Sequence, residues 1–205
     1  MDAALRAGIA IYNQGQYHAA HDAWEDHWLT LPSGTDDELL LHGLIQFTAA
    51  VYHAWNRNWA GCTGLANSAQ EYLAPLPAEY RGVALAPVRS SLAALEQDPE
   101  TVERAPPMKL RYNGSPLTAD DLNFEESVIF ATVIATEQGY DEALIEQTSN
   151  YASEAVNAKE SNPFVGLLFD FVREPAHREL IMERISAHVA RRKHEESDVS
   201  GLFEE

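Results

Sequence analysis

The sequence predicts an all-α protein, a helical bundle with a helical C-terminal extension. Three observations support this fold class. Apolar residues recur at helical spacing through most of the chain, Gly and Pro interrupt it at intervals of about one helix, and no long alternating run indicates a sheet. At most one short hairpin or strand is expected, around residues 108–112. With 45% hydrophobic residues, a chain of 205 residues can bury a core without metal or disulfide cross-links.

Five helices are expected in the N-terminal part. Gly15 ends the first, Pro32 begins the break after the second, and Asp36 or Asp37 can cap the third. The third, which contains LLLHGLIQFTAAVYHAW, is apolar on nearly every side, so we expect it at the centre of the bundle. The expected ranges are 5–13, 17–31, 36–58, 61–73 and 87–96.

The stretch PPMKLRYNGSPLT, residues 106–118, is the best linker candidate, because its prolines and its Asn-Gly pair break helices. It separates a helical bundle at 1–105 from a helical extension at 119–195, and an acidic tail at 196–205 is expected to be mobile. Within the extension, Pro163–Val172 is unusually apolar. We expect it to form core, with a contact to a protein partner as the alternative. The helices expected in the extension are 122–138, 141–159, 164–172 and 175–194.

The charge of the chain is its most unusual global property. The formal net charge is −18, and the acidic residues are spread along the whole sequence. Self-repulsion of this size disfavours a compact state in dilute buffer and is screened over about 3 Å in molar salt. We therefore expect a halophilic protein; a basic protein partner or a chelating surface for divalent cations is the alternative. Nucleic acid binding is not expected, because the basic patch at 191–193 is embedded among acids.

A cytoplasmic location without membrane contact, and self-association as a homodimer, are expected. Cys62 is the only cysteine, which excludes an internal disulfide and fits a reducing compartment. The N-terminal residues have no basic start followed by a long apolar stretch, and no segment approaches the roughly 20 apolar residues of a membrane span.

The residues with chemical potential lie on the second and third expected helices. In YHAAHDAWEDHWL, helical spacing puts His21 at the edge of an apolar face and Glu25 one turn later. On the third helix, His42, Gln46 and His53 follow one line across an apolar surface. Buried polar groups need hydrogen-bond partners, so we expect these two polar edges to face each other.

This constellation allows three interpretations. A polar network that fixes how the helices pack is favoured, and a pocket for a neutral ligand comes second. The residues of that network or ligand site are His21, Glu25, Gln46, His53, Trp28 and Asn13. The third interpretation is a divalent metal bound by His21 and Glu25. It departs from the HExxH pattern of zinc hydrolases, because Glu25 stands where the second His would be. No cofactor is predicted otherwise.

Motifs of other enzyme classes are absent from the sequence. There is no GxSxG elbow, Walker loop or dinucleotide-type glycine cluster. Cys62 is expected to pack near a helix start rather than to act as a nucleophile. The four tryptophans are expected in the core rather than in a ligand-binding box.

Two segments, YNQGQYHAAHDAWEDHWL and HGLIQFTAAVYHAWNRNWAGC, resemble the uncharacterised helical family called domain of unknown function 309, over roughly residues 5–75. Its members show an aromatic-Asn-x-Gly-x-aromatic start, an Ala-His-Glu-x-x-Glu core, a Gly-Leu-Ile-Gln helix and a following His with Gly-Asn-x-x-Gly-Ala. The matching residues are Asn13, Gly15, Tyr17, Ala20, His21, Glu25, Trp28, Gly43, Leu44, Ile45, Gln46, His53, Asn58 and Gly61. Two positions differ: Asp22 replaces a glutamate, and Arg57 replaces a glycine.

The resemblance implies an all-α bundle and no agreed activity. We therefore predict a non-enzymatic binding or scaffold protein. The alternative is a metal-dependent, hydrolase-like enzyme that uses His21, Glu25 and His53, which requires these side chains within about 4 Å of a common point.

Overall fold

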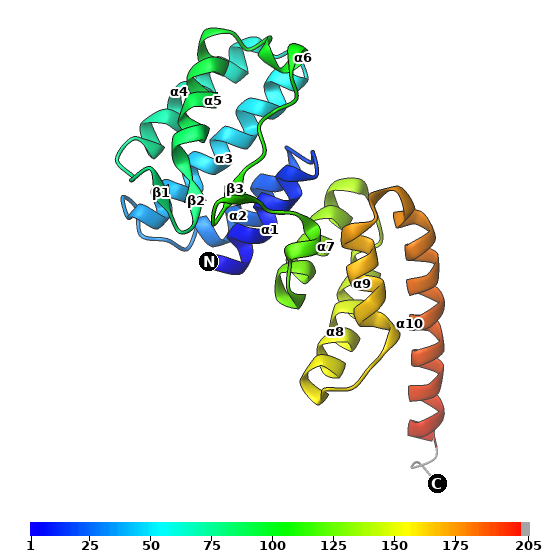
Figure 1. Cartoon of the computed structure of the whole chain (residues 1–205). Coiled ribbons are helices and arrows are strands. Elements are labelled where there is room, and N and C mark those ends of the chain that lie inside the picture. Colours follow the sequence, from blue (N-terminus) through cyan, green and yellow to red (C-terminus); the bar gives the residue numbers. More distant parts are fainter. Residues whose placement is uncertain (202–205) are drawn as a thin grey trace. The chain divides into compact units, whose positions relative to one another are not determined.

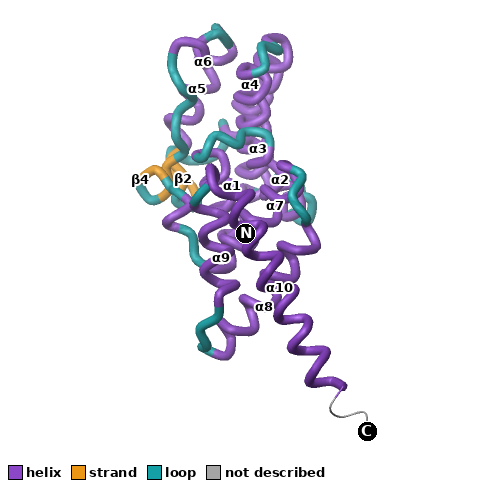
Figure 2. Tube along the Cα trace, turned by 90° about the vertical axis from the view of Figure 1, so that its right-hand side faces the viewer, coloured by secondary structure: helices purple, strands orange, loops and turns teal. Residues whose placement is uncertain are grey.

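The computed structural model describes residues 1–201, with side chains through Asp198. It divides the chain into two compact units, Met1–Leu122 and a second unit that begins at Asn123. The predicted all-α fold class is confirmed, since helices dominate both units and the strands of the described residues form one small sheet (Figure 2). No helix within residues 1–201 is long and apolar enough to cross a membrane.

The first unit is built around one central helix, α3, which packs against α2, α4 and α5 (Figure 1). Its N-cap is Thr35, whose hydroxyl accepts a hydrogen bond from the amide of Glu38, rather than Asp36 or Asp37. Both aspartates instead lie in the first turn, where the helix dipole favours negative charge. The helices are α1 Asp2–Asn13, α2 Ala19–Trp28, α3 Asp36–Trp55, α4 Trp59–Leu73, α5 Leu85–Gln97 and the unexpected short α6 Thr101–Arg104.

Helices α1 and α2 meet where the side chain of Trp24 on α2 occupies the space that a side chain at Gly8 of α1 would need. Trp24 is fully buried, and its indole N–H donates to the carbonyl oxygen of Leu5 at 3.3 Å. A Cβ atom on Gly8 would come within 2.2 Å of the indole. Only glycine therefore lets α1 approach α2 this closely.

The small sheet of the first unit consists of two hairpins of two-residue strands. The strands pair antiparallel in the order β1-β2-β3-β4 and span β1 Glu79–Tyr80, β2 Val83–Ala84, β3 Arg111–Tyr112 and β4 Ser115–Pro116. The second hairpin includes the strand expected near 108–112, and its turn is the Asn-Gly pair, with both residues at positive φ. The first hairpin was not expected from the sequence, because strands of two residues show no detectable alternation.

Residues 106–118 belong to the first unit, and the division between the units falls after Leu122. Asn13 ties this segment to the end of α1. Its side-chain amide donates to the carbonyl oxygens of Leu110 and Leu117 and accepts from the amide of Leu110, each at 2.8 Å. The stretch predicted as a linker is thus held by buried hydrogen bonds.

Within residues 123–201, the second unit contains four α-helices. These are α7 Phe124–Gln138, α8 Glu142–Ala158, α9 Pro163–Arg173 and α10 Arg178–Gly201. The apolar side of α9 is buried within the unit, as expected for a core segment; its buried residues are Phe164, Leu167, Leu168, Phe171 and Val172. Helix α10 continues into the predicted acidic tail through Gly201, and the rest of that tail, 202–205, lies outside the described residues.

Candidate binding site on the first unit

A line of polar side chains runs along α3 and forms a continuous series of hydrogen bonds. His42 Nδ1 donates to Glu38 Oε1 at 3.1 Å, and Gln46 Nε2 donates to His42 Nε2 at 3.1 Å. Because the carboxylate fixes the proton on Nδ1, the Nε2 atom of the neutral ring is an acceptor. We call this line, which continues past Ala49 to His53, the α3 strip.

Aromatic rings from the neighbouring helices flank His42. Tyr72 of α4 stacks on the imidazole, with ring centroids 3.6 Å apart, and Trp28 of α2 lies 4.6 Å away. The Trp28 indole N–H also donates to Glu38 Oε1 at 2.9 Å. The ring contacts with Tyr72 and Trp28 hold the orientation of His42. Only 18% of the His42 side chain is exposed.

Glu38 is the buried anion on which this arrangement depends. Burial by itself raises the pKa of its carboxyl group, but hydrogen bonds from Trp28, the amide of Gly34 and His42 outweigh burial, so the pKa lies below its usual value. Glu38 is therefore ionised at neutral pH and accepts from three donors. Glu38 is not among the residues predicted for the site, although its spacing of four residues before His42 is a usable signal.

His53, further along the strip, is held by the turn between α3 and α4. Asn58 Oδ1 accepts from the amide of Gly61 at 3.1 Å, which fixes the side-chain amide so that Nδ2 donates to His53 Nδ1 at 2.8 Å. The proton of the neutral ring is consequently on Nε2. A Cβ atom on Gly61 would lie 2.7 Å from Asn58 Nδ2, so glycine is required there.

His21 on α2 pairs with its sequence neighbour rather than with Glu25. Its Nε2 atom lies 2.8 Å from Asp22 Oδ1, and 23% of the His21 side chain is exposed. The hydrogen bond with Asp22 raises the pKa of His21 most, burial opposes it, and the charges of Asp22 and Glu25 add to the increase. Nδ1 lies near the carbonyl group of His18, which also favours the charged ring, but it is buried without a hydrogen bond of good geometry.

Two ring contacts join α2 and α3, which run in opposite directions. Trp28 contacts His42 at one end, and the rings of His18 and Tyr52 lie 5.0 Å apart at the other. Glu25 is exposed, so its carboxylate lies at the rim rather than inside.

One buried atom on each of α2 and α3 has no hydrogen-bond partner. They are His21 Nδ1 and Gln46 Oε1, one on each helix. Leaving a buried acceptor without a donor costs about 1–3 kcal/mol. The bonds of Glu38 and His42 are thus complete, whereas Gln46 Oε1 and His21 Nδ1 have no hydrogen-bond partner.

The other predicted residues are distributed as follows. Asn13 lies at the second hairpin, where its side chain bonds to the backbone of Leu110 and Leu117. Ligand atoms of His21, Asp22 and Glu25 come within 4.8 Å of one another, and His53 is not part of this group.

Two further expectations have different outcomes. The prediction that all four tryptophans are core holds for Trp24, which is fully buried, and is wrong for Trp55, which is 57% exposed at the last turn of α3; Trp28 and Trp59 are half-buried. Cys62 is fully buried in the first turn of α4, as expected for a packing residue. Burial raises the pKa of its thiol to about 11, so the thiolate is scarce at neutral pH.

The geometry defines an all-α protein whose first unit carries half-buried imidazole and amide groups along its central helix. Residues 5–65 of the chain match the family model described as Domain of unknown function (DUF309), which confirms the predicted resemblance for this segment. The match includes His21, Gln46, His53 and Gly61. No curated protein matches the chain.

Proposed function

We propose that the protein is a non-enzymatic binding protein and that the α3 strip, together with His21, binds a ligand rich in hydrogen-bond donors. The observation that carries this proposal is the buried Gln46 Oε1 atom, which has no donor although the rest of its hydrogen-bond series is complete. A ligand that donates an N–H group to this oxygen removes the cost of leaving it unpaired.

His21 supports the same ligand chemistry. The carboxylate of Asp22 lies 2.8 Å from His21 Nε2, and Glu25 lies one turn further along the same helix. Asp22 and Glu25 add negative charge beside it, which favours a cationic donor over a neutral one. A guanidinium or ammonium group, as on a basic peptide side chain, supplies the donor that Gln46 Oε1 lacks.

The hydrogen-bond series argues for binding rather than for acid–base catalysis. It runs from Glu38 through His42 to Gln46 and ends on an amide, which neither takes up nor releases a proton at ordinary pH. The imidazole of His42 is therefore positioned as a fixed hydrogen-bonding group. A general base would require a titratable or reactive partner within hydrogen-bond distance at that end.

Two small probes of opposite chemistry test the proposal. Propylguanidinium only donates hydrogen bonds, and butyrate only accepts them. NMR spectra of the full chain should show the Trp28 indole N–H and the His21 ring signals shifting with propylguanidinium and not with butyrate. Gln46→Leu should weaken propylguanidinium binding about tenfold, because a buried hydrogen bond to a charged group is lost.

Gln70→Leu is the matched control, since Gln70 lies on α4 and bonds to Glu96. Its affinity for propylguanidinium should equal that of the unmodified protein. Equal responses to both probes, no response to either, or equal affinities of the two leucine variants would overturn the proposal.

A second candidate function, divalent cation binding, is favoured by one specific observation. Ligand atoms of His21, Asp22 and Glu25 lie within 4.8 Å of one another on one face of α2. A cation would displace the Nε2 proton that His21 shares with Asp22. Titration with Mn²⁺ should then broaden the His21 signals at one equivalent, and Glu25→Gln should abolish the effect. Broadening that survives in this variant would rule out the site.

We also infer that the protein is adapted to a salt-rich cytoplasm and self-associates. The net charge of −18 supports the first inference, since counter-ions at high concentration screen repulsion over short distances. Light scattering across a salt series is the test. A compact dimer in molar salt that dissociates or unfolds as salt is withdrawn is expected, and a monomer with unchanged stability at low salt would refute both inferences.

A further inference from the structure

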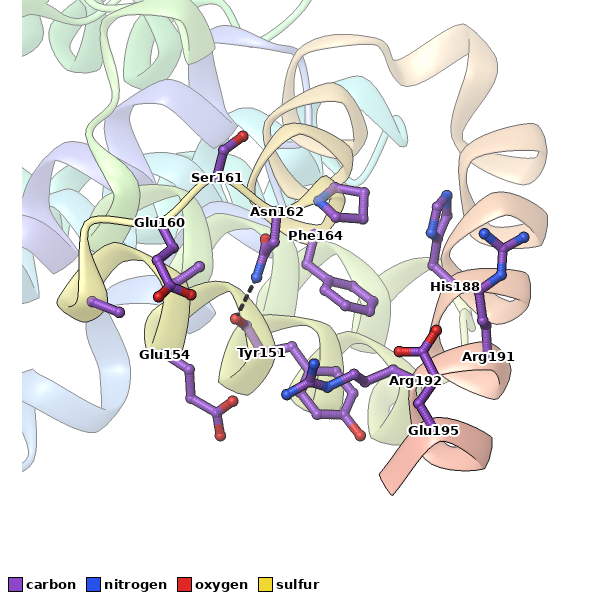
Figure 3. A pocket seen from close by; sticks show the side chains of 13 residues that line it. Tyr151, Glu154, Glu160, Ser161, Asn162, Phe164, His188, Arg191, Arg192 and Glu195 are labelled. Atoms are coloured by element: carbon purple, nitrogen blue, oxygen red, sulfur yellow. Dashed lines mark hydrogen bonds between the residues drawn. The ribbon is translucent and has the colours of Figure 1, made fainter. Parts of the chain in front are cut away.

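Two pockets in the described part of the chain differ in the chemistry of their linings. The larger has a volume of about 450 Å³ and lies in the second unit, between the end of α8, the turn into α9, and α10 (Figure 3). Glutamates and arginines both line it, and Arg192 already donates to Glu196 at 2.9 Å. The smaller pocket, of about 190 Å³, lies in the first unit and has no charged lining residue. The lining of the smaller pocket therefore favours a single ligand chemistry.

The smaller pocket lies beside α3, between α5 and the segment that contains α6 and the two prolines after it. We call it the α5–α6 pocket. Three of its lining residues, Val51, Leu95 and Val102, are buried apolar side chains. An apolar cavity of about 150 Å³ already accommodates a benzene molecule. The volume of the α5–α6 pocket thus fits a molecule with one ring or a short aliphatic chain rather than a drug-sized ligand.

One edge of the α5–α6 pocket is stiff. Pro106 and Pro107 line this edge, and the ring of each proline fixes its φ angle. Just before them, the amide of Ala105 donates to the carbonyl oxygen of Thr101 at 3.1 Å at the end of α6. A preformed edge lowers the entropy cost of binding, because the chain does not have to become ordered around the ligand.

Both charged side chains of α6 are paired within the protein. Arg104 forms an ion pair with Asp98, and Glu103 forms one with Arg57 at 2.8 Å. Neither charge of α6 is therefore available to a ligand. A charged group placed against the apolar lining would lose hydration without gaining a counter-charge, so the pocket favours a neutral molecule.

Two hydroxyl groups supply the polar part of the lining. Ser91 belongs to α5 and Thr101 is the first residue of α6, and both residues are half-buried. Among the described residues, neither hydroxyl makes a hydrogen bond, whereas the neighbouring Ser90 donates to the carbonyl oxygen of Ala86 at 3.1 Å. A hydroxyl group both donates and accepts, so either one can pair with a hydroxyl or a carbonyl group of a ligand.

We propose that the α5–α6 pocket binds a small neutral molecule that combines an apolar body with one hydroxyl or carbonyl group. The body packs on the buried apolar side chains, and the polar group forms a hydrogen bond with Ser91 or Thr101. Met108, which also lines the pocket, has a flexible side chain that adapts to the outline of the ligand. The pocket shares no lining residue with the α3 strip, so this inference does not depend on the function proposed above.

Three probes with one aromatic ring test the preference for a neutral ligand. Benzyl alcohol has the predicted chemistry, benzylammonium carries a positive charge, and benzoate carries a negative charge. NMR titration of the full chain should shift the methyl signal of Met108 with benzyl alcohol and leave that of Met182, in the second unit, unchanged. Both ions should bind at least about tenfold more weakly than the alcohol, because their charge finds no counter-ion.

Two substitutions to leucine test the location of the site. Ser91→Leu fills the pocket and should weaken the binding of benzyl alcohol at least about tenfold, since the ligand and the new side chain compete for one space. Ser90→Leu is the matched control, because it makes the same change at an exposed neighbouring position outside the lining. Its affinity for benzyl alcohol should equal that of the unmodified protein.

A double variant tests the two hydroxyl groups without filling the pocket. Ser91→Ala combined with Thr101→Val should weaken the binding of benzyl alcohol about fivefold, because one hydrogen bond is lost. The affinity for toluene, which has no polar group, should stay the same. The double variant removes only hydroxyl groups at half-buried positions, so folding should be retained, and thermal denaturation verifies it.

Four results would overturn the proposal. Benzyl alcohol would leave the Met108 signal unchanged, or the two ions would bind as tightly as the alcohol. Equal losses of affinity in Ser91→Leu and Ser90→Leu would place the binding outside the pocket. Equal changes for benzyl alcohol and toluene in the double variant would show that the hydroxyl groups do not contact the polar group of the ligand.

Discussion

The two units of the protein bury their polar side chains in different ways. The first unit contains all four tryptophans and five of the eight histidines, and it places Glu38 and His42 between packed helices. The second unit has no tryptophan and packs regular amphipathic helices, and its one buried charged side chain beyond the Glu126 cap, among the described residues, is Arg178. The comparison indicates that the first unit depends on a hydrogen-bonded network and the second mainly on apolar packing.

The largest expected effect follows from removing the anion of the first unit. Glu38→Ala leaves the indole N–H of Trp28, the amide of Gly34 and the Nδ1–H of His42 without their acceptor. The free energy of unfolding should fall by about 2–4 kcal/mol. Urea denaturation followed by tryptophan fluorescence measures the change. Glu25→Ala, at an exposed position, is the control; similar losses in both variants would contradict a special role for Glu38.

The corresponding change in the second unit should be smaller. Arg178 Nε donates to the carbonyl oxygen of Phe171 at 3.0 Å, and Nη1 donates to Gln138 at 3.1 Å. Arg178→Met keeps an apolar stem and leaves those acceptors unpaired, at a cost of about 1–2 kcal/mol. Thermal denaturation should show this loss of stability. The ring of Tyr140 packs on Phe171, so its NMR signals should report the local change. A loss equal to that of Glu38→Ala would break the contrast between the units.

A gain in stability is expected at one position of the first unit. Arg57 adopts a left-handed conformation with φ 57°, where the related family has glycine. Arg57→Gly should stabilise the protein by about 1 kcal/mol, because glycine has no Cβ clash there. The exposed ion pair with Glu103, at 2.8 Å, contributes little. Arg57→Ala removes the same ion pair but keeps Cβ, so chemical denaturation should show no gain for it.

The smallest effect is the pH dependence of the first unit. Because the hydrogen bond to Asp22 raises the pKa of His21 above 6.5, charged His21 favours the folded state. This contribution is fully present below pH 6.5 and disappears as the pH rises through the raised pKa. It should stay below about 1 kcal/mol, since both side chains are partly exposed. The free energy of unfolding, measured from pH 5 to 9, should lose this pH-dependent contribution in Asp22→Asn. If the contribution is unchanged in that variant, another group causes it.

The sequence predicts the helices well because their apolar spacing and their Gly and Pro boundaries are local signals. The ends of the second helix and the start of α10 differ by a few residues from expectation, as frayed turns do. The β1–β2 hairpin escapes prediction because its strands have two residues each, and their pairing depends on contacts with β3. The placement of 106–118 depends on Asn13, a partner about one hundred residues away.

The candidate site was predicted only in part, for a related reason. The line of His42, Gln46 and His53 is a prediction from helical spacing; all three residues lie on α3, where Gln46 donates to His42. The partners of these residues come from other elements, such as Tyr72 of α4, or from turn geometry, as with Asn58. No periodicity reveals such partners. Pairing of His21 with Asp22 instead of Glu25 is a rotamer choice, which spacing alone does not determine.

The bonds of Asn13 to the second hairpin have a practical consequence for dividing the chain. A fragment that stops at residue 105, where helical periodicity first fails, would expose the end of α1. The side-chain amide of Asn13 would then lose both of its acceptors and its donor. One that runs through Leu122 retains both hairpins and the hydrogen bond from Arg6 to the carbonyl of Asp121. The last turn of the first helix therefore decides where an autonomous N-terminal piece can end.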